Sequence, residues 1–600
     1  MQRKEYIEMK EKEMAVALQT VAAIKNSKDP NVKYRDSRPI TDIKHMIETS
    51  AAKYAERPAF WVRKEKKKPF EPVTYKEMLD DVNSLGTALI AMGQKGKRIS
   101  VIGANSYPWA ISYLAAVCGT GVVVPLDKEL SASELKQLVI EGEVSCVLMA
   151  DKHKKDFVEM MKSGDTQLEL LISFEQAEDD EDVKSFKEAV KKGAQLLAEG
   201  DTSFTEAEID GNEMQILLFT SGTTGISKGV MLSHRNIAED LMIAPTVLLV
   251  TPDEIFFSVL PLHHTYECTC GFLMPLYKGA SVAHCEGLKH IVNNLSEIRP
   301  TFFLGVPAIF EMLYKKIWAT VRKKGKEDTL KKAIKINRVT KKFGIDLGGK
   351  LFKDITALFG GRMKMIICGG AAINPEVLDG LRDFGIMALQ GYGLTEAAPM
   401  GALNPDTAPV SKSIGRAFPH SELSISNPDE NGIGEICIKG DHIMLGYYKR
   451  PDLTEEVIKD GKFYTGDLGY IDEKGYAYIT GRKKNVIITK NGKNVFPEEL
   501  EYYLSNVDII LESVVFGKDA ALGDDIVIAA YIKLDEEAIM EKYGEMPSEE
   551  ELMKELWAAV DKINAENPLF KQIKQIKIKE GEFDKNSSKK IRRFKEENKF

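Results

Sequence analysis

Residues 217–230 read LLFTSGTTGISKGV, and the chain is organised around this stretch. The mostly apolar run from Met214 to Phe219 predicts a short buried strand, and apolar character resumes at Val230. Between them lie Thr, Ser and Gly residues and one lysine, Lys228. Glycines leave the backbone free to curl, so that several N–H groups can point into one concavity, and hydroxyls and a cation beside them suit a polyphosphate. The spacing differs from a Walker A loop, and the alternative is a flexible polar surface loop.

The composition of the chain is that of a globular protein. It has 600 residues, of which 44% are hydrophobic, and a formal net charge of -8, which argues against nucleic-acid binding. Its seven cysteines are scattered and odd in number, which favours a reducing compartment over a disulfide framework. The charged N-terminus lacks the apolar region of a signal peptide, and no apolar run is long enough to span a membrane. These features predict a soluble cytoplasmic protein.

Alternating strand and helix patterns predict an α/β fold. Strands are expected at 98–103 and 122–127, with a helix between them around 109–117, and such β-α-β units imply parallel sheets. We expect a large N-terminal domain of layered parallel sheets and helices with a small β subdomain, and a small mobile α+β C-terminal domain. The predicted boundaries are a charged extension at 1–40, the large domain at 41–483 and the small domain at 484–600.

A basic segment interrupts this acidic chain. Residues 315–353 contain fourteen Lys and Arg residues against three acidic residues, with apolar positions interspersed. One interpretation is a solvated helical insertion. The other is a surface that meets anionic lipid or the phosphates of CoA, because basic amphipathic helices bind such surfaces.

Two adjacent histidines, His263 and His264, follow a strand predicted at 255–261. The nearby cysteines and His284 invite a zinc interpretation, but their spacing differs from that of zinc-binding motifs, so a zinc site is not favoured.

Three further segments place small, aromatic and acidic residues after predicted strands. They are Gly369–Ala372, Ala388–Glu396 and Tyr464–Asp467. Taken alone, Tyr392 could be a core aromatic, Glu396 a solvated acid and Asp467 a turn residue.

Together these motifs resemble the adenylate-forming superfamily, which includes acyl-CoA synthetases, luciferases and adenylation domains of peptide synthetases. The resemblance runs from about residue 42 to Arg593. It implies a polyphosphate loop formed by Thr220, Ser221, Gly222, Thr223, Thr224, Gly225 and Lys228. It implies an adenine and nucleotide site formed by Gly370, Ala371, Ala372, Gln390, Gly391, Tyr392, Gly393, Asp467 and Arg482.

The resemblance also implies catalytic and mechanical roles. Thr395 would contact phosphate, and Glu396 would hold Mg²⁺, which favours few carboxylates and completes its shell with substrate phosphates. His264, in a Pro-x-x-His step, would lie at the mouth of the acyl pocket, and Lys484 would be the interdomain hinge. Lys590 would be the catalytic lysine near the C-terminus. Lys589 stands where the superfamily has glycine, and it remains a second candidate.

The implied reaction uses ATP, Mg²⁺ and CoA. A carboxylic acid would be activated to acyl-AMP with release of pyrophosphate, and the acyl group would pass to CoA. The basic insertion, residues 306–311 and Gly360–Arg362 resemble the long-chain fatty acyl-CoA synthetases, so we expect a long-chain fatty acid and peripheral contact with the inner membrane surface. The alternatives are a ligase that loads an acyl or aryl acid onto a carrier protein, and a non-catalytic protein that binds nucleotide or acyl-CoA.

Overall fold

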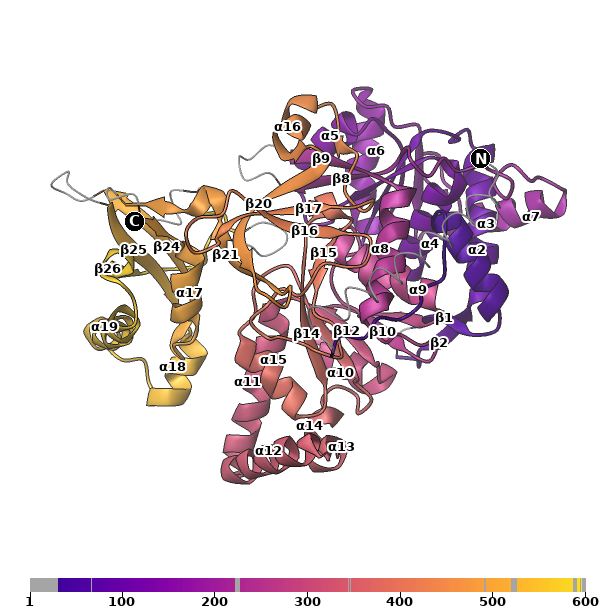
Figure 1. Cartoon of the computed structure of the whole chain (residues 1–600). Helices are drawn as coiled ribbons and strands as arrows, with labels where there is room; N and C mark the ends of the chain where they lie inside the picture. Colours follow the sequence, from indigo (N-terminus) through magenta and orange to yellow (C-terminus); the bar gives the residue numbers. More distant parts are fainter. Residues whose placement is uncertain are drawn as a thin grey trace.

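The computed structural model describes residues 31–65, 67–221, 227–343, 345, 347–489, 493–519, 526–585, 591–593 and 595. Within these residues the chain forms a large α/β domain, a β subdomain beside it and a small α+β domain at the C-terminal end (Figure 1). The predicted fold class is therefore confirmed. Most of the predicted N-terminal extension, residues 1–30, lies outside the described residues.

The first sheet of the large domain carries the opening stretch of the sequence analysis. It has eight strands in the order β18-β9-β8-β4-β3-β5-β6-β7, and all of its pairings are parallel except the two that β9 forms, with β8 and with β18. Its strands are β3 (Arg98–Ile102), β4 (Val122–Leu126), β5 (Val144–Met149), β6 (Leu170–Ser173), β7 (Lys184–Ser185), β8 (Met214–Ser221), β9 (Ser227–Ser233) and β18 (Gly446–Tyr447).

The second sheet also has eight strands, in the order β15-β14-β13-β12-β10-β11-β1-β2, and only its two outermost pairs are antiparallel. Its strands are β1 (Pro58–Val62), β2 (Glu71–Thr74), β10 (Ile255–Ser258), β11 (Ser281–His284), β12 (Phe302–Gly305), β13 (Met365–Cys368), β14 (Met387–Gly393) and β15 (Met400–Leu403). Near-continuous apolar runs such as Met365–Cys368 suit strands that are buried on both faces.

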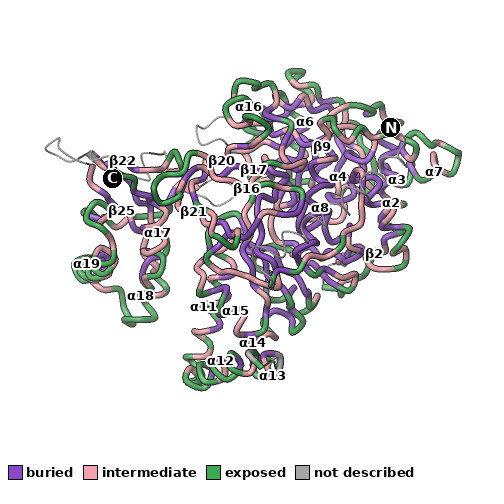
Figure 2. Tube along the Cα trace, viewed as in Figure 1, coloured by how far each residue is buried: buried purple, intermediate pink, exposed green. Residues whose placement is uncertain are grey.

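The largest hydrophobic core joins the two sheets through helices (Figure 2). It contains buried residues of α2 (Ile43–Tyr54), α3 (Tyr75–Ala91), α4 (Tyr107–Ala115) and α8 (His234–Val247). The apolar spacing after Asp42 predicted α2, and the Asp42 side chain caps it by accepting from the His45 N–H. The other helices of this domain are α5 (Ala132–Glu141), α6 (Lys154–Ser163), α7 (Phe186–Ala198), α9 (Met274–Lys278), α10 (Ile291–Ile298), α14 (Lys353–Ala357), α15 (Pro375–Asp383) and α16 (Pro451–Val457).

The basic segment is helical, as one interpretation of its sequence predicted. It covers most of α11 (Pro307–Lys323), all of α12 (Glu327–Lys342) and α13 (Gly348–Leu351). Figure 1 shows α12 and α13 at the end of the molecule that lies farthest from β8 and β9.

The β subdomain is a five-stranded sheet that adjoins both domains. It contains β16 (Glu422–Ser426), β17 (Gly434–Lys439), β19 (Ile458–Lys459), β20 (Lys462–Ile471) and β21 (Ala477–Arg482). All of its described pairings are antiparallel, and Gly415 connects it to the large domain through a bridge to Ala477.

The C-terminal domain has a core of its own. Its three-stranded sheet is formed by β24 (Ile510–Asp519), β25 (Ile526–Leu534) and β26 (Ile573–Ile578), and it packs with α17 (Pro497–Ser505), α18 (Glu536–Tyr543) and α19 (Glu549–Ala565). Ser548 and Glu551 form the predicted capping box of α19. The short strands β22 (Ile487–Ile488) and β23 (Asn494–Val495) begin this domain, and Ile487 and Val495 belong to its core. In the described part of the chain, no helix is long and apolar enough to cross a membrane.

Candidate active site

The predicted site segments follow the carboxyl ends of neighbouring parallel strands. The Pro261–His264 turn follows β10, Gly369–Ala372 follows β13, and Gly391 to Glu396 closes β14 and continues beyond it. In α/β sheets, ligands bind outside the carboxyl ends of the strands. The topology therefore brings three motifs to one edge of the sheet, although the first and the last of them, at His264 and Glu396, are about 130 residues apart in the sequence.

The polyphosphate segment is a hairpin tip, and its loop is shorter than the sequence suggested. Thr220 pairs with Lys228 and Ser221 pairs with Ser227, so β8 and β9 extend beyond the apolar runs that predicted them. Threonine favours a strand, and cross-strand pairing of the hydroxyl residues extends the ladder. The intervening residues, which include Gly222, Thr223, Thr224 and Gly225, lie outside the described part of the chain.

Tyr447 connects the hairpin lysine to the candidate magnesium ligand. The Lys228 Nζ lies 4.7 Å from the centre of the Tyr447 ring, and the Tyr447 hydroxyl donates to Glu396 Oε1 at 2.8 Å. Burial and the Glu396 carboxylate raise the pKa of Tyr447 well above its usual value, so its hydroxyl keeps the proton that it donates. A cation and a carboxylate thus flank one aromatic side chain.

Tyr447 was not among the residues that the sequence predicted. It lies on β18, which pairs with β9, so its position depends on a contact between segments more than 200 residues apart. The available signal was the dipeptide Gly446-Tyr447, a glycine followed by an aromatic residue as in Gly391-Tyr392.

A second group joins the large domain to the β subdomain. The Tyr392 hydroxyl donates to Asp467 Oδ2 at 2.5 Å, and Arg482 Nε forms an ion pair with Asp467 Oδ1 at 2.7 Å. Asp467 is only 3% exposed, and burial raises the pKa of Tyr392 well above its usual value. The buried Asp467 carboxylate thus holds Tyr392 of the large domain and Arg482 of the β subdomain together.

Lys484 lies beside both groups. Burial, together with the nearby positive charges of Arg482 and Lys228, lowers the pKa of its ammonium group to about 8, against the opposing effect of Asp467. Three cations that approach closely enough to disfavour one another suit a polyanionic ligand. The residue predicted as the hinge is thus close to the candidate nucleotide site.

Tyr266 links two other predicted segments. Its hydroxyl donates to the Ile367 carbonyl at 2.8 Å, and its ring lies against Gly369, where a Cβ atom would come within 3.0 Å of the ring. Tyr266 follows the His264 turn, so the candidate acyl-pocket mouth and the Gly370, Ala371 and Ala372 turn are neighbours. Gly370 has a φ of +84°, which favours glycine.

His263 and His264 pack against each other, and His263 is buried. The rings of His263 and His264 lie 4.1 Å apart, and His263 Nε2 is 3.6 Å from Asp127 Oδ2. Burial and His264 lower the pKa of His263 to about 3. Among the described residues, no group of three or more His, Cys, Asp or Glu side chains is arranged to hold a metal ion.

Two of the remaining predicted residues, Gln390 and Thr395, lie within the described part of the chain. Gln390 is buried on β14, and Thr395 begins a short 3₁₀ turn, Thr395–Ala397, that carries Glu396. Lys589 and Lys590 lie outside the described residues. The residues that flank them belong to the C-terminal domain, because Lys585 bridges to Ile591 and Lys585 Nζ lies 2.6 Å from Glu512.

Comparisons with known proteins identify the family of the chain. Residues 47–448 match the family model of the AMP-binding enzymes, and residues 484–600 match that of the AMP-binding enzyme C-terminal domain. Long chain acyl-CoA synthetase 1 of Arabidopsis thaliana is 30% identical over 76% of this chain and 73% of its own length. Fatty acyl-CoA synthetase A of Dictyostelium discoideum is 28% identical over 86% of this chain and 82% of its own.

Solved structures share the fold. The crystal structure of the anthranilate CoA ligase AuaEII in complex with anthranoyl-AMP has a TM-score of 0.73 at 19% identity, over 92% of this chain and 96% of that one. The o-succinylbenzoate-CoA synthetase MenE of Bacillus subtilis, in complex with ATP and magnesium ion, has a TM-score of 0.68 at 20% identity, over 91% of this chain and 98% of that one.

The fold, the site and these matches define an ATP-dependent adenylating enzyme. The chain belongs to the AMP-binding enzyme family, and its class is that of the adenylate-forming acid–thiol ligases that make acyl-CoA. The predicted superfamily is therefore confirmed.

Gly393 gives a test of the backbone geometry beneath Glu396. A Cβ atom at Gly393 would lie 2.0 Å from the Pro399 carbonyl oxygen, whereas one at Gly391 would lie 2.9 Å from the end of the flexible Leu403 side chain. We expect Gly393→Ala to destabilise the protein by about 2 kcal/mol through overpacking and Gly391→Ala to cost less. Thermal unfolding of both variants measures the difference, and equal melting temperatures would contradict the packing described for this turn.

Proposed function

We propose that this ligase activates long-chain fatty acids with ATP to acyl-AMP and pyrophosphate, and then transfers the acyl group to CoA, which releases AMP. The observation that supports it is that five predicted residues come together in two groups. Lys228 and Glu396 are joined by Tyr447, which was not predicted, and Tyr392 and Arg482 are joined by Asp467. The relatives that are named for long-chain and fatty acyl-CoA synthesis support the choice of acid.

The first half-reaction brings two anions together, the carboxylate of the acid and the α-phosphate of ATP. Positive charge that is fixed in advance stabilises such a transition state, because it need not be rearranged during the reaction. In the proposal, Lys228 and the hairpin tip hold the outer phosphates, and Arg482 and Lys484 add positive charge beside the nucleotide. Tyr392, with Gln390, Gly391 and Gly393 around it, and the Gly370–Ala372 turn would bind the adenine.

Glu396 fits a magnesium site. It is a single carboxylate on a turn beside the phosphate hairpin, and the Tyr447 hydroxyl orients one of its oxygens. Mg²⁺ binds through one or two carboxylates together with substrate phosphates, where it neutralises their charge. Thr395, at the start of the same turn, would contact phosphate.

The acyl chain would enter beside His264. The helical turns that follow it, Tyr266–Leu273, are buried among the apolar residues of the main core. Glu267 is the acidic residue within this segment, and burial raises its pKa to about 8, so that it is mostly uncharged at neutral pH. An uncharged Glu267 is compatible with an alkyl chain nearby, because a buried charge beside an apolar ligand would be costly.

Lys590 would act in the first half-reaction, and Lys484 would be the hinge that permits the second. In the proposal, Lys590 reaches the carboxylate and α-phosphate during adenylation, and a rotation of the C-terminal domain at Lys484 withdraws it so that CoA can enter. Such gating by domain rotation is a common device in enzymes. We further propose that the enzyme works in the cytoplasm and contacts the inner membrane surface through residues 315–353.

A panel of acids tests the proposed substrate. If the chain lies in an apolar tunnel, each added methylene contributes about 0.8 kcal/mol, so kcat/KM should rise roughly fourfold per methylene until the tunnel is full. AMP release with free CoA measures this for saturated acids of increasing length. A preference for short or aryl acids, or for a holo-carrier protein over CoA, would contradict the proposal, and no pyrophosphate exchange with any acid would favour a non-catalytic binder.

The substitution Lys590→Ala tests whether this lysine serves only acyl-AMP formation. It should abolish acyl-AMP formation and spare thioester formation from supplied acyl-AMP, because only the first step brings two anions together. Lys589→Ala is the matched control and should retain both steps. Loss of adenylation in Lys589→Ala alone would move the catalytic role to that residue.

Tyr447→Phe tests the link between Lys228 and Glu396. This substitution removes the hydroxyl that orients Glu396 but keeps the ring beside Lys228. A hydrogen bond to a charged group contributes about 1.5–3 kcal/mol, so the Mg²⁺ concentration for half-maximal adenylation should rise about tenfold or more. Tyr448→Phe is the neighbouring control. An unchanged Mg²⁺ dependence in Tyr447→Phe would show that its hydroxyl does not serve Glu396.

A further inference from the structure

Helix α12 has two apolar faces, and only one of them is covered. Its inner face carries Leu330 and Ile334, which are buried in the hydrophobic cluster around α11 and α15. Its outer face carries Ile336, Val339 and Phe343, the last of which directly follows the helix, and these side chains are 53%, 55% and 79% exposed. Spacings of three and four residues place these three side chains on one side of the helix.

The inner face is fixed to the domain by polar contacts as well. Arg338 forms two hydrogen bonds with the Asp383 carboxylate, at 2.7 and 2.6 Å. Asn337 is 1% exposed, and its amide donates to the Asp383 carbonyl and accepts from the Leu347 N–H. The helix therefore cannot readily roll over to bury its outer face, and the exposed apolar stripe is a fixed feature of the surface.

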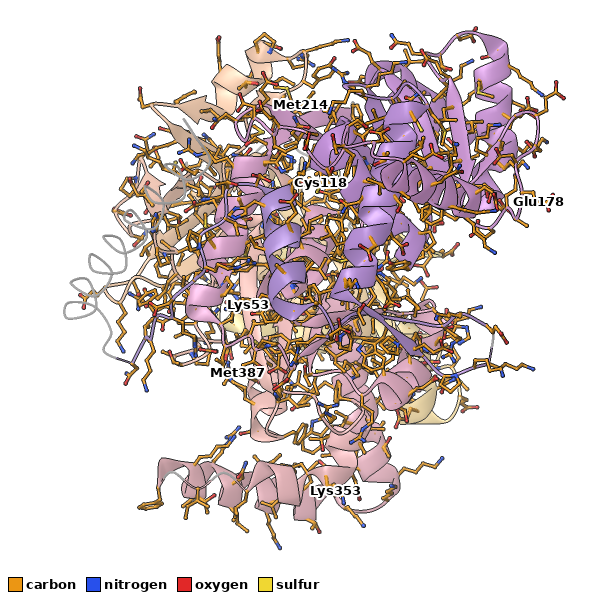
Figure 3. The ribbon with its side chains drawn as sticks, turned by 90° about the vertical axis from the view of Figure 1, so that its right-hand side faces the viewer. Lys53, Cys118, Glu178, Met214, Lys353 and Met387 are labelled. Carbon is orange, nitrogen blue, oxygen red and sulfur yellow. The ribbon has the colours of Figure 1, made fainter. Side chains whose placement is uncertain are left out.

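Positive charge surrounds this stripe. Lys332 and Lys335 are exposed beside it, and neither forms an ion pair with a described carboxylate. Exposed cations continue along the ends of the neighbouring helices, at Arg322, Lys323, Lys324, Lys326 and Lys353. Figure 3 shows this helix along the lower edge of the molecule, near the labelled Lys353, with side chains directed away from the body.

We propose that the outer face of α12 is a docking surface for an anionic phospholipid bilayer. Lys332 and Lys335 would lie at the level of the lipid phosphates, and Ile336, Val339 and Phe343 would enter the boundary of the acyl chains. A helix with an apolar face and flanking lysines lies in this way in the plane of an interface. The inference rests on the proposed function in one respect, since a long-chain fatty acid dissolves in bilayers, which are then its source.

A second copy of the chain fits this surface less well. A two-fold contact would place the same face against itself and would bring two segments together that each have fourteen basic and three acidic residues. The repulsion would oppose the gain from apolar burial. An anionic bilayer offers apolar material and opposite charge together.

Sedimentation of the full-length protein with lipid vesicles tests this inference. We expect the protein to pellet with vesicles that contain one-third phosphatidylserine in phosphatidylcholine, to remain in solution with phosphatidylcholine alone, and to be released by salt. The substitutions Val339→Ser and Phe343→Ser together should reduce binding at least tenfold. Lys332→Gln and Lys335→Gln together should reduce it about twenty-five-fold, at roughly fivefold per lysine.

Matched controls come from exposed positions elsewhere. Leu569, which is 77% exposed on the C-terminal domain, is replaced by Ser, and the exposed Lys155 by Gln. Both variants should bind vesicles like the unmodified protein. Adenylation of a water-soluble acid is measured for every variant, so that loss of membrane binding with intact adenylation is distinguished from failure of the proposed function or of folding.

Three results would overturn the inference. The first is equal recovery in the supernatant with and without anionic vesicles. The second is vesicle binding that survives both pairs of substitutions, which would place the contact on another part of the chain. The third is a dimer in light scattering that Phe343→Ser dissociates, which would make a second copy the occupant of this face.

Discussion

The site depends on the placement of one neutral aromatic side chain between two opposite charges. Lys228 and Glu396 would form an ion pair if they met directly, and each would then satisfy the other. Tyr447 keeps them apart, because it offers its ring face to the ammonium and its hydroxyl to the carboxylate. Both contacts orient the charged groups without neutralising them. In the proposed mechanism, this arrangement would keep Lys228 available for phosphate and Glu396 for a metal ion.

This placement requires the whole large domain to be folded. Tyr447 belongs to the segment between β17 and β20 of the β subdomain, yet it pairs with β9 of the first sheet. Glu396 comes from the end of β14 in the second sheet, and its carbonyl accepts from the Met444 N–H at 2.9 Å. Segment 444–447 thus joins the two sheets on one side of the site, as Asp467 and Arg482 join Tyr392 to the subdomain on the other.

The sequence predicted those parts of the molecule that local chemistry determines. Strands such as Val144–Met149 are apolar runs of suitable length, the capping box of α19 is contained within four residues, and the motifs around Lys228, Tyr392 and Asp467 carry their residue types in order. Tyr447 could not be predicted, because its role comes from a strand pairing over more than 200 residues. The extension of β8 and β9 past the apolar runs likewise depends on cross-strand pairing, which a single strand does not reveal.

The basic helix illustrates the same limit. Its sequence shows cations and apolar residues in alternation, but it has two apolar stripes, and either could face the core. Asp383 decides between them, since its carboxylate binds Arg338 and its carbonyl binds Asn337, which turns Leu330 and Ile334 inward. The choice leaves Val339 and Phe343 outside.

The positions of the two surfaces agree with their proposed tasks. Helix α11 begins directly after the carboxyl end of β12, at the edge of the sheet where the active site lies, and its 17 residues span about 25 Å at 1.5 Å per residue. Helix α12 follows at its far end and docks on Asp383, shortly before the amino end of β14. The proposed membrane face and the ATP site thus lie at opposite edges of one sheet. A bilayer at the amino edge would leave the carboxyl edge in water, where ATP and CoA could reach the proposed site and the proposed rotation of the C-terminal domain could take place.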